Sequence, residues 1–316
     1  MVRRMERRTC NNISYSERPL RVPRLAFSGN LQLPRFPRLR LQTFKQTPSV
    51  LELDTLVLSG GGIKGIAMLG AVAALNKHKV FDRVNTFVGV SVGSIVATVL
   101  AMKLDPRAVF TTHVLDFKYV ADIDITRLDK TFGLDSGKYL EEWIATIVPD
   151  MTFEEFHARF ASHLVVVVTD LNLHCPVYFS HVETPAFSVR KALRMSCSIP
   201  LYFSAVPHDG HLYVDGGVSN NFPLEHAVTT LGSKRVFGIK FRSSPRAAGH
   251  SWSLETFLGS LVESNVNRMH SWIPTKILEL ETGGVNPTQF KLSKKEKISL
   301  FEAGYAQAQS FVKKHH

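Results

Sequence analysis

The run from Val84 to Ala97 places a serine on a tight turn between a short apolar strand and a helix. Ser91 stands at the centre of the turn, with Gly89 and Gly93 on either side in a G-x-S-x-G pattern. Such a turn forces its central residue into a strained backbone conformation, lifts the hydroxyl clear of the sheet and sets it at a helix N-terminus. The pattern predicts a nucleophilic serine. A purely structural turn can produce the same five residues, so the rest of the chain has to decide.

The chain around this turn alternates between strand-like and helix-like segments from Leu53 onward. Residues 54–59 form a short apolar strand, and residues 64–79 have the small and apolar spacing of a buried helix. Residues 164–169 are almost continuously apolar, as strands are in a parallel sheet that is covered on both faces. The alternation predicts an α/β fold, with three α/β/α layers around a mostly parallel sheet.

The length of 316 residues suits one large core with an extension. We expect a catalytic domain over residues 51–316, with its signature segments within 53–241 and C-terminal helices within 253–314. Residues 1–50 are the extension, which contains five prolines and is expected to be disordered or loosely docked.

Positive charge is concentrated in residues 1–47, which hold eleven Lys and Arg against two Glu. Nine of the eleven net positive charges therefore lie in the extension, and the rest of the chain is close to neutral. Nucleic-acid binding by the folded part is not expected from this balance. The extension either solubilises the protein, contacts anionic phospholipid headgroups or directs the chain to an organelle.

The apolar runs and the cysteines of the sequence indicate where in the cell the protein is located. The purest apolar run is strand-sized, well short of the ~18 residues that span a bilayer, and no secretory signal pattern precedes it. Three cysteines are too few for a disulfide framework. We expect an intracellular protein, cytoplasmic or peripheral on membranes, and the sequence does not indicate its oligomeric state.

The glycine-rich stretch from Ser59 to Gly65 admits three interpretations. Gly60, Gly62 and Gly65 satisfy the dinucleotide pattern G-x-G-x-x-G, but the next strand ends without the acid that would hold a ribose. A phosphate-binding loop would need its lysine after the last glycine, with Ser or Thr following. The remaining interpretation is an oxyanion hole, formed by backbone N–H groups at a helix N-terminus one strand before Ser91.

A nucleophilic serine also needs a base, because a hydroxyl is a weak nucleophile at neutral pH. His226 is the best placed of the histidines after Asp215, but none lies in a glycine-marked loop at a strand end. Asp215 ends a predicted strand and precedes Gly216 and Gly217, where the backbone can bend sharply. An aspartate held against a hydroxyl in a partly dry site can accept its proton directly. The alternative is an ordinary turn aspartate.

Three segments, in this order, resemble the signature blocks of the patatin-like phospholipase family: residues 60–65, 89–93 and 215–217. Residues 195–203 also resemble the serine-and-proline block that precedes the aspartate loop in that family. The resemblance covers about Leu53 to Phe241 well, the C-terminal helices loosely and the N-terminal extension not at all. The chain departs from the family pattern at two positions, neither of them Ser91 or Asp215. Residue 59 is a serine where many members have aspartate, and residue 64 is a lysine where many have arginine.

The resemblance implies a lipid acyl hydrolase that uses a Ser-Asp dyad without a catalytic histidine. By match, Ser91 is the nucleophile, Asp215 the proton acceptor, and Gly61, Gly62 and Ile63 the oxyanion hole. It implies a phospholipase A or lysophospholipase type of reaction through an acyl-enzyme, with no metal or cofactor. The substrate would be a phospholipid or another lipid ester, met at a membrane surface. A catalytically weak lipid-binding protein on the same fold is the main alternative, and a nucleotide-binding enzyme is a more distant one.

Overall fold

The computed structural model describes residues 53–243 and 275–315, together with residues 252, 253, 256, 257, 260 and 264. The predicted extension, residues 1–50, and the domain boundary after it lie outside the described residues. Most of the apolar helical stripe expected within residues 254–269 also lies outside them.

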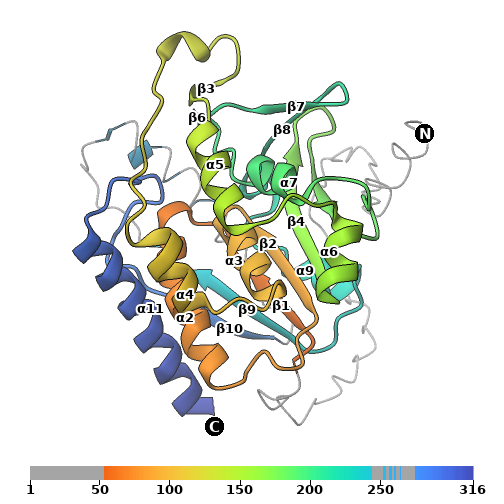
Figure 1. The fold of residues 1–316 in the computed structure, drawn as a ribbon, viewed down its shortest axis with the longest axis vertical. Helices are drawn as coiled ribbons and strands as arrows, with labels where there is room; N and C mark the ends of the chain where they lie inside the picture. Colours follow the sequence, from red (N-terminus) through yellow and green to blue (C-terminus); the bar gives the residue numbers. More distant parts are fainter. Residues whose placement is uncertain are drawn as a thin grey trace, which may run out of the picture. The chain divides into compact units, whose positions relative to one another are not determined.

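An eight-stranded sheet forms the centre of the described chain (Figure 1). Its strand order is β10-β9-β1-β2-β4-β8-β7, and β5 pairs with β4. The strands are β1 (Thr55–Leu58), β2 (Thr86–Val90), β4 (His163–Asp170), β5 (Cys175–Phe179), β7 (Val206–His208), β8 (His211–Asp215), β9 (Val236–Phe241) and β10 (Lys276–Leu280). The five strands from β10 to β4 run parallel, whereas β5, β7 and β8 pair antiparallel. The predicted mostly parallel sheet is confirmed.

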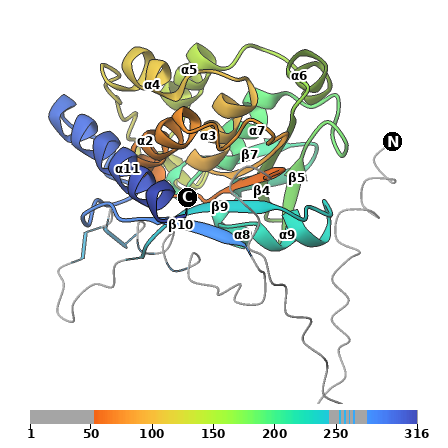
Figure 2. The same cartoon turned by 90° about the horizontal axis from the view of Figure 1, so that it is seen from below.

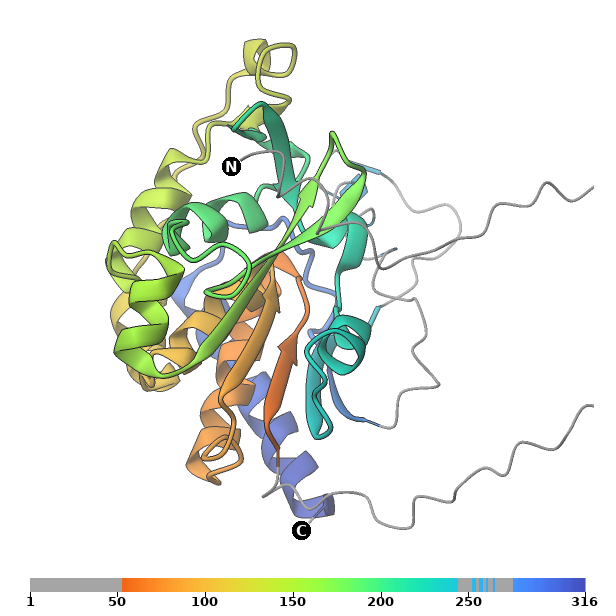
Figure 3. The same ribbon diagram turned by 90° about the vertical axis from the view of Figure 1, so that its right-hand side faces the viewer.

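Helices cover both faces of this sheet, which confirms the three predicted layers (Figures 2 and 3). Helices α8 (Gly217–Asn220) and α9 (Leu224–Thr229) lie on one face. The larger layer on the other face consists of α2 (Gly65–Lys77), α3 (Val92–Ala101), α4 (Pro106–Val109), α5 (Lys138–Ile147), α6 (Phe153–Phe160), α7 (Val189–Ser196) and α11 (Lys294–His315). Among the described residues, no helix combines the length and apolarity needed to cross a bilayer.

The central strands divide their side chains between two cores, because neighbouring residues of a strand point to opposite faces. Leu56 and Leu58 of β1 belong to the core under the larger helix layer, and Val57 belongs to the core under α8 and α9. In β4 the same alternation separates Leu164 and Val166 from Val165 and Val167. Burial on both faces is the physical reason that these strands read as continuous apolar runs.

Two strands meet end to end along one edge of β4. Strand β5 pairs with residues 166–170 of β4, so β2 and β8 must share the opposite edge. Val90 at the end of β2 pairs with Val167, and Asp215 at the end of β8 pairs with Val168, the next residue of β4. The antiparallel direction of β8 therefore brings its C-terminal end against the C-terminal end of β2.

A tight hairpin turn gives β8 this direction. Asp209 and Gly210 link β7 to β8, with φ angles of 49° and 80°. Positive φ at both central residues is the geometry that an Asp-Gly pair favours in a two-residue hairpin. Residues 117–132 contain a short 3-10 turn, η4 (Ile125–Arg127), and an isolated bridge from Ile123 to Asp135. They lead into β3 (Gly133–Asp135), which pairs with β6 (Leu201–Phe203) in a separate small sheet.

We predict that a histidine at the start of β4 makes the fold sensitive to acid. Burial, with smaller contributions from His181 and His157, lowers the pKa of His163 to about 4. An unfolded histidine titrates near ~6.5, so between these values the unfolded chain binds a proton that the folded chain does not. Stability contributed by neutral His163 is therefore lost as the pH falls through this window. Thermal melts should show a smaller loss of Tm from pH ~7 to ~4.5 in His163→Phe than in the unchanged protein. Parallel losses would contradict the prediction.

Candidate active site

The backbone of Ser91 has the strained conformation that the glycine-flanked turn predicts. Its φ of 52° and ψ of −131° lie outside the regions that residues other than glycine normally occupy. The two flanking glycines let strand and helix approach closely, since a Cβ atom at Gly89 would lie 2.4 Å from the Cα of Ser94. At Gly93 it would lie 2.4 Å from the carbonyl oxygen of Ser59. The turn presents Ser91 at the N-terminus of α3, with the residue buried.

A second serine, which the sequence did not single out by itself, holds this turn in place. The Ser196 hydroxyl accepts a hydrogen bond from the Ser91 backbone N–H at 2.8 Å and donates one to the Val167 carbonyl at 2.6 Å. Ser196 is fully buried at the end of α7. It therefore ties the elbow to β4 at the residue where β2 ends.

Asp215 lies beside Ser91 in a dry environment. Its Oδ1 atom accepts a hydrogen bond from the Gly217 N–H at 2.7 Å, whereas Oδ2 has no hydrogen bond of normal geometry among the described residues. Burial raises the pKa of Asp215 to about 7, and the Ser91 hydroxyl and the Gly217 N–H lower it in part. The structure thus brings together the two residues that the sequence suggested, with a carboxyl group that titrates near neutral pH.

An asparagine that sequence reasoning missed lies next to this pair. Asn221 is buried, and neither its amide nitrogen nor its amide oxygen has a hydrogen bond within the described part of the chain. A Cβ atom at Gly60 would lie 2.3 Å from its Oδ1 and 3.1 Å from the Cβ of Ser91. Buried polar groups are normally paired, so these atoms can bind a reactant or an ordered water molecule. The two consecutive asparagines after the aspartate loop were the available signal in the sequence.

The glycine loop places unpaired backbone donors between β1 and α2. Within the described residues, the N–H groups of Gly61 and Gly62 have no hydrogen-bond acceptor. Gly62 has a φ of 55°, and a Cβ atom there would lie 2.0 Å from the Pro287 carbonyl oxygen, so only glycine fits. Ile63, the third predicted donor, gives its N–H to that same carbonyl at 2.9 Å. The free donors of the loop are therefore those of Gly61 and Gly62.

The remaining motif glycines also permit close packing around the pair. A Cβ atom at Gly65 would lie 2.1 Å from the Val92 side chain, and one at Gly216 would lie 2.3 Å from the Val167 carbonyl oxygen. At Gly217 it would lie 2.7 Å from Oδ1 of Asn221. These glycines let the three loops converge at the ends of β1, β2 and β8.

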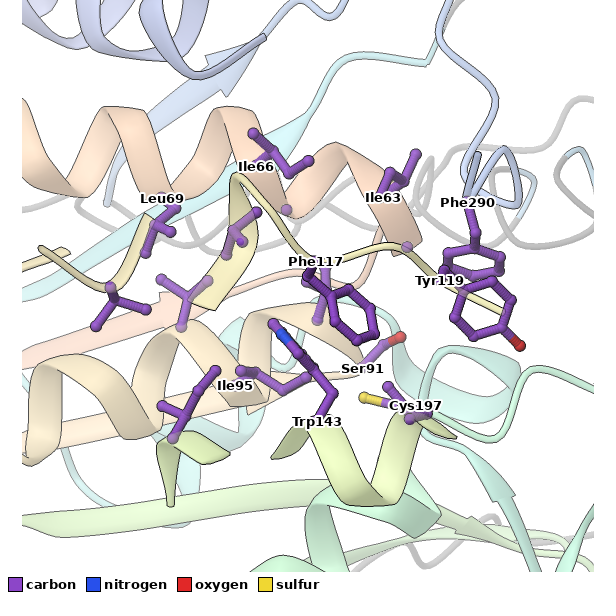
Figure 4. Close-up of a pocket in the computed structure, with 18 of the residues that line it drawn as sticks. Ile63, Ile66, Leu69, Ser91, Ile95, Phe117, Tyr119, Trp143, Cys197 and Phe290 are labelled. Carbon is purple, nitrogen blue, oxygen red and sulfur yellow. The ribbon is translucent and has the colours of Figure 1, made fainter. Parts of the chain in front are cut away.

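An apolar cavity of about 130 Å³ lies directly over Ser91 (Figure 4). Aliphatic and aromatic side chains from several elements line it, among them Ile66, Leu69, Ile95, Val99, Phe117 and Trp143. Lys297 reaches its wall from α11, but its ammonium group donates to the carbonyls of Val114, Leu115 and Phe117. The cavity thus offers space for an apolar group next to the serine.

The Cys197 thiol points toward Ser91 at the edge of this cavity (Figure 4). Burial is the main factor that raises the pKa of Cys197, and the neighbouring Asp215 carboxylate raises it further. A thiol with a raised pKa stays protonated and is a poor nucleophile. The Cys197 thiol is therefore a poor alternative to the Ser91 hydroxyl at this position.

The histidine that remained a candidate base lies elsewhere. The His226 ring stacks on Tyr178 of β5, with ring centroids 3.5 Å apart. Burial lowers its pKa to about 4, so the ring is neutral at physiological pH. Among the described residues, no histidine is hydrogen-bonded to Ser91 or Asp215. In the same part of the chain, no cluster of His, Cys, Asp or Glu side chains has the arrangement of a metal site.

Residues 56–228 match the family model described as "Patatin-like phospholipase", which spans the elbow, the glycine loop and the aspartate loop. The chain belongs to the patatin-like phospholipase family. This patatin-like chain is 28% identical over 273 residues to "Probable lipid hydrolase 463L" of Invertebrate iridescent virus 6, which covers 82% of this chain and 89% of the viral protein. It is 26% identical to human "Patatin-like phospholipase domain-containing protein 4", over 80% of this chain and 94% of the human protein.

A solved structure shares the fold of this patatin-like chain. The crystal structure of VipD from Legionella pneumophila matches with a TM-score of 0.57 and 17% identity. The match covers 84% of this chain and 67% of that one. At this identity the likeness supports the fold alone, which agrees with the three-layer architecture described above.

We predict that Ser196 contributes to stability because it satisfies two buried backbone groups at once. Ser196→Ala would leave both the Ser91 N–H and the Val167 carbonyl without a partner, at ~1–3 kcal/mol for each group. Urea denaturation should therefore show a loss of about 2–6 kcal/mol in the free energy of unfolding. Ser162→Ala is the matched control, because the buried Ser162 hydroxyl shares its one proton between the Ala101 and Phe160 carbonyls, and among the described residues its removal leaves no backbone N–H unpaired. Equal losses in the two variants would argue against the double role of Ser196.

Proposed function

We propose that this protein is a lipid acyl hydrolase, of phospholipase A or lysophospholipase type, that works through Ser91 and Asp215. One observation carries the proposal: Ser91, strained on its elbow, lies beside the buried Asp215 carboxyl group at the floor of an apolar cavity. Family membership and the printed names of the relatives, a probable lipid hydrolase and a phospholipase-domain protein, point to the same class of substrate.

In the first half of the proposed reaction, Ser91 attacks the ester carbonyl carbon. The hydroxyl proton passes to the Asp215 carboxylate as the bond from Oγ to carbon forms. Negative charge then develops on the carbonyl oxygen, and the N–H groups of Gly61 and Gly62 are the donors that would stabilise it. Collapse of this intermediate breaks the bond to the alcohol, which takes the proton back from Asp215 and leaves as an alcohol. The acyl group remains on Ser91.

In the second half, water replaces the alcohol. Asp215 accepts a proton from a water molecule as its oxygen attacks the acyl carbon, and the oxyanion forms again at the same donors. When the bond from carbon to Oγ breaks, the proton returns from Asp215 to Ser91, and the fatty acid is released. Asn221 is placed to hold the attacking water, since both of its amide atoms are unpaired beside the reacting serine within the described chain.

The surroundings of Asp215 suit this role as a base. Its raised pKa of about 7 makes the carboxylate a stronger proton acceptor than an exposed aspartate, whose pKa is near ~3.9. Direct contact with the serine makes an intervening imidazole unnecessary. The apolar cavity would hold the acyl chain and exclude bulk water from the acyl-enzyme.

Replacing either member of the pair should abolish hydrolysis and leave the fold intact. We expect Ser91→Ala and Asp215→Asn each to lower kcat/KM for a fatty-acyl ester by about 10⁴-fold or more, because each removes a group that the reaction cannot replace. The measurement is fatty-acid release from a panel of defined phospholipids, lysophospholipids and glycerides, with circular dichroism as the check on folding.

Labelling by a fluorophosphonate probe separates catalysis from lipid binding on the same fold. A hydrolase should form an adduct at Ser91 in the unchanged protein, and the folded Ser91→Ala protein should form none. Retained hydrolysis in Ser91→Ala would refute the proposed mechanism. Folded, unmodified protein that never reacts with the probe would favour a lipid-binding protein.

Activity should depend on pH through the ionisation of Asp215. The base must be ionised to accept the serine proton, so kcat/KM should rise with pH and level off above about 7. Below this value the rate should fall about tenfold per pH unit. The profile is measured with a soluble uncharged ester, so that the substrate itself does not titrate. A profile that is flat from pH ~5 to ~8, or one with its midpoint near ~4, would contradict the assignment.

A further inference from the structure

Exposed apolar side chains are concentrated in one irregular segment, residues 120–132, here called the tip loop. Val120, Ile123, Ile125 and Phe132 are between 50% and 68% exposed. They are four of the fourteen large exposed hydrophobic side chains in the described residues. Figures 1 and 3 show this segment projecting beyond β3 and β6, away from the body of the sheet. Exposed apolar side chains concentrated on a projecting segment indicate a surface that contacts another protein or a membrane.

A fifth apolar side chain extends the same surface. Leu201 is 42% exposed and pairs in register with Gly133, the residue that follows Phe132. The tip loop and the first residue of β6 therefore lie side by side, although they are distant in the sequence.

Hydrogen bonds to β3 hold the tip loop in its exposed position. Asp135, which is fully buried, accepts hydrogen bonds from the Tyr119 hydroxyl at 2.5 Å, the Asp122 N–H at 2.8 Å and the Gly137 N–H at 2.7 Å. Within the tip loop, the Asp124 N–H donates to the Leu134 carbonyl of β3 at 2.8 Å. These bonds fix both ends of the loop, so its apolar side chains cannot simply fold back into the core.

The tip loop continues directly into the wall of the cavity over Ser91. Phe117 and Tyr119 line that cavity, and Val120 is the first residue of the tip loop. On the neighbouring strand, Phe203 lines the cavity two residues after Leu201. An apolar path thus connects the projecting surface with the candidate active site.

The charges of the tip loop do not fit an anionic partner. Three aspartates stand against one arginine and one lysine. Arg127 pairs with Asp122 at 3.1 Å and lies 4.0 Å from Asp124, which also caps η4. Because two of the acids are paired within the loop, apolar contact is the interaction that the surface offers.

We propose that the tip loop and Leu201 insert into the interface of a lipid bilayer and hold the cavity against it. The inference rests on the proposed function, because a membrane is where a lipid ester would be met. Apolar side chains of this number can enter the boundary between headgroups and acyl chains, where burial of each one is favourable. A second copy of this chain fits less well, since a stable protein interface takes about 20–30 residues on each side.

The test measures vesicle binding with hydrolysis switched off. Full-length Ser91→Ala protein is compared with the same protein carrying Ile123→Asp and Ile125→Asp, on phosphatidylcholine vesicles in 1 M salt. Electrostatic binding by the basic extension is suppressed there, because the Debye length is only ~3 Å. We expect sedimentation with vesicles to weaken by at least about tenfold, since each buried isoleucine contributes on that order.

A control places one aspartate on a similarly exposed residue outside the tip loop. Val182, 63% exposed in the turn after β5, is changed to Asp and should leave vesicle binding within about twofold. In proteins that retain Ser91, the tip variant should lose about tenfold in turnover of vesicle lipid. It should keep its turnover of a soluble short-chain ester, because neither isoleucine lines the cavity.

Equal vesicle binding with and without the two aspartates would overturn the proposal. If the two aspartates also changed the oligomeric state in gel filtration, the tip loop would be assigned to self-association. Failure of the proposed function would look different, because no ester would be hydrolysed by the unchanged protein while vesicle binding could still depend on the tip loop.

Discussion

The end-to-end meeting of β2 and β8 along β4 is the constraint on which the rest of the site depends. It sets Val90 and Asp215 against consecutive residues of β4, so the elbow after β2 and the aspartate loop after β8 reach one point. The Thr169 hydroxyl donates to the Asp215 carbonyl at 2.8 Å and helps to fix this register. A slip of one residue would turn the Asp215 side chain to the opposite face of the sheet, because side chains alternate along a strand.

Placing a carboxyl group at this point costs stability. The pKa of Asp215 rises from 3.8 to about 7, which corresponds to roughly 4 kcal/mol against the folded state once the solution is above both values. The strained backbone of Ser91 adds to this cost. Two fully formed cores, on opposite faces of the sheet, offset it. The same burial that destabilises the carboxylate makes it a better proton acceptor. The loss of folding stability and the basicity of Asp215 therefore have the same physical cause.

The segment from Arg194 to Phe203 joins the site to the projecting surface. Arg194 is almost fully buried and donates to the Ser136 and Ser204 carbonyls, which lie beside β3 and β6. Ser196, two residues later, holds the elbow, and Phe203 forms part of the cavity wall. Ten consecutive residues therefore connect the reacting serine, the apolar cavity and the tip loop. Sequence reasoning identified this segment only by its resemblance to a family block.

The sequence by itself determined the α/β class, the glycine-flanked elbow of Ser91 and the approximate bounds of β1, α2 and β4, because these depend on local periodicity and turn chemistry. It also proposed Asp215 by the absence of a suitable histidine. Only the tertiary structure decided that Asp215 lies beside Ser91, that Ile63 donates elsewhere, and that Ser196 and Asn221 surround the pair. Those relations arise from strand order, from the direction of β8 and from packing between distant loops. A local pattern contains no information about which strands become neighbours.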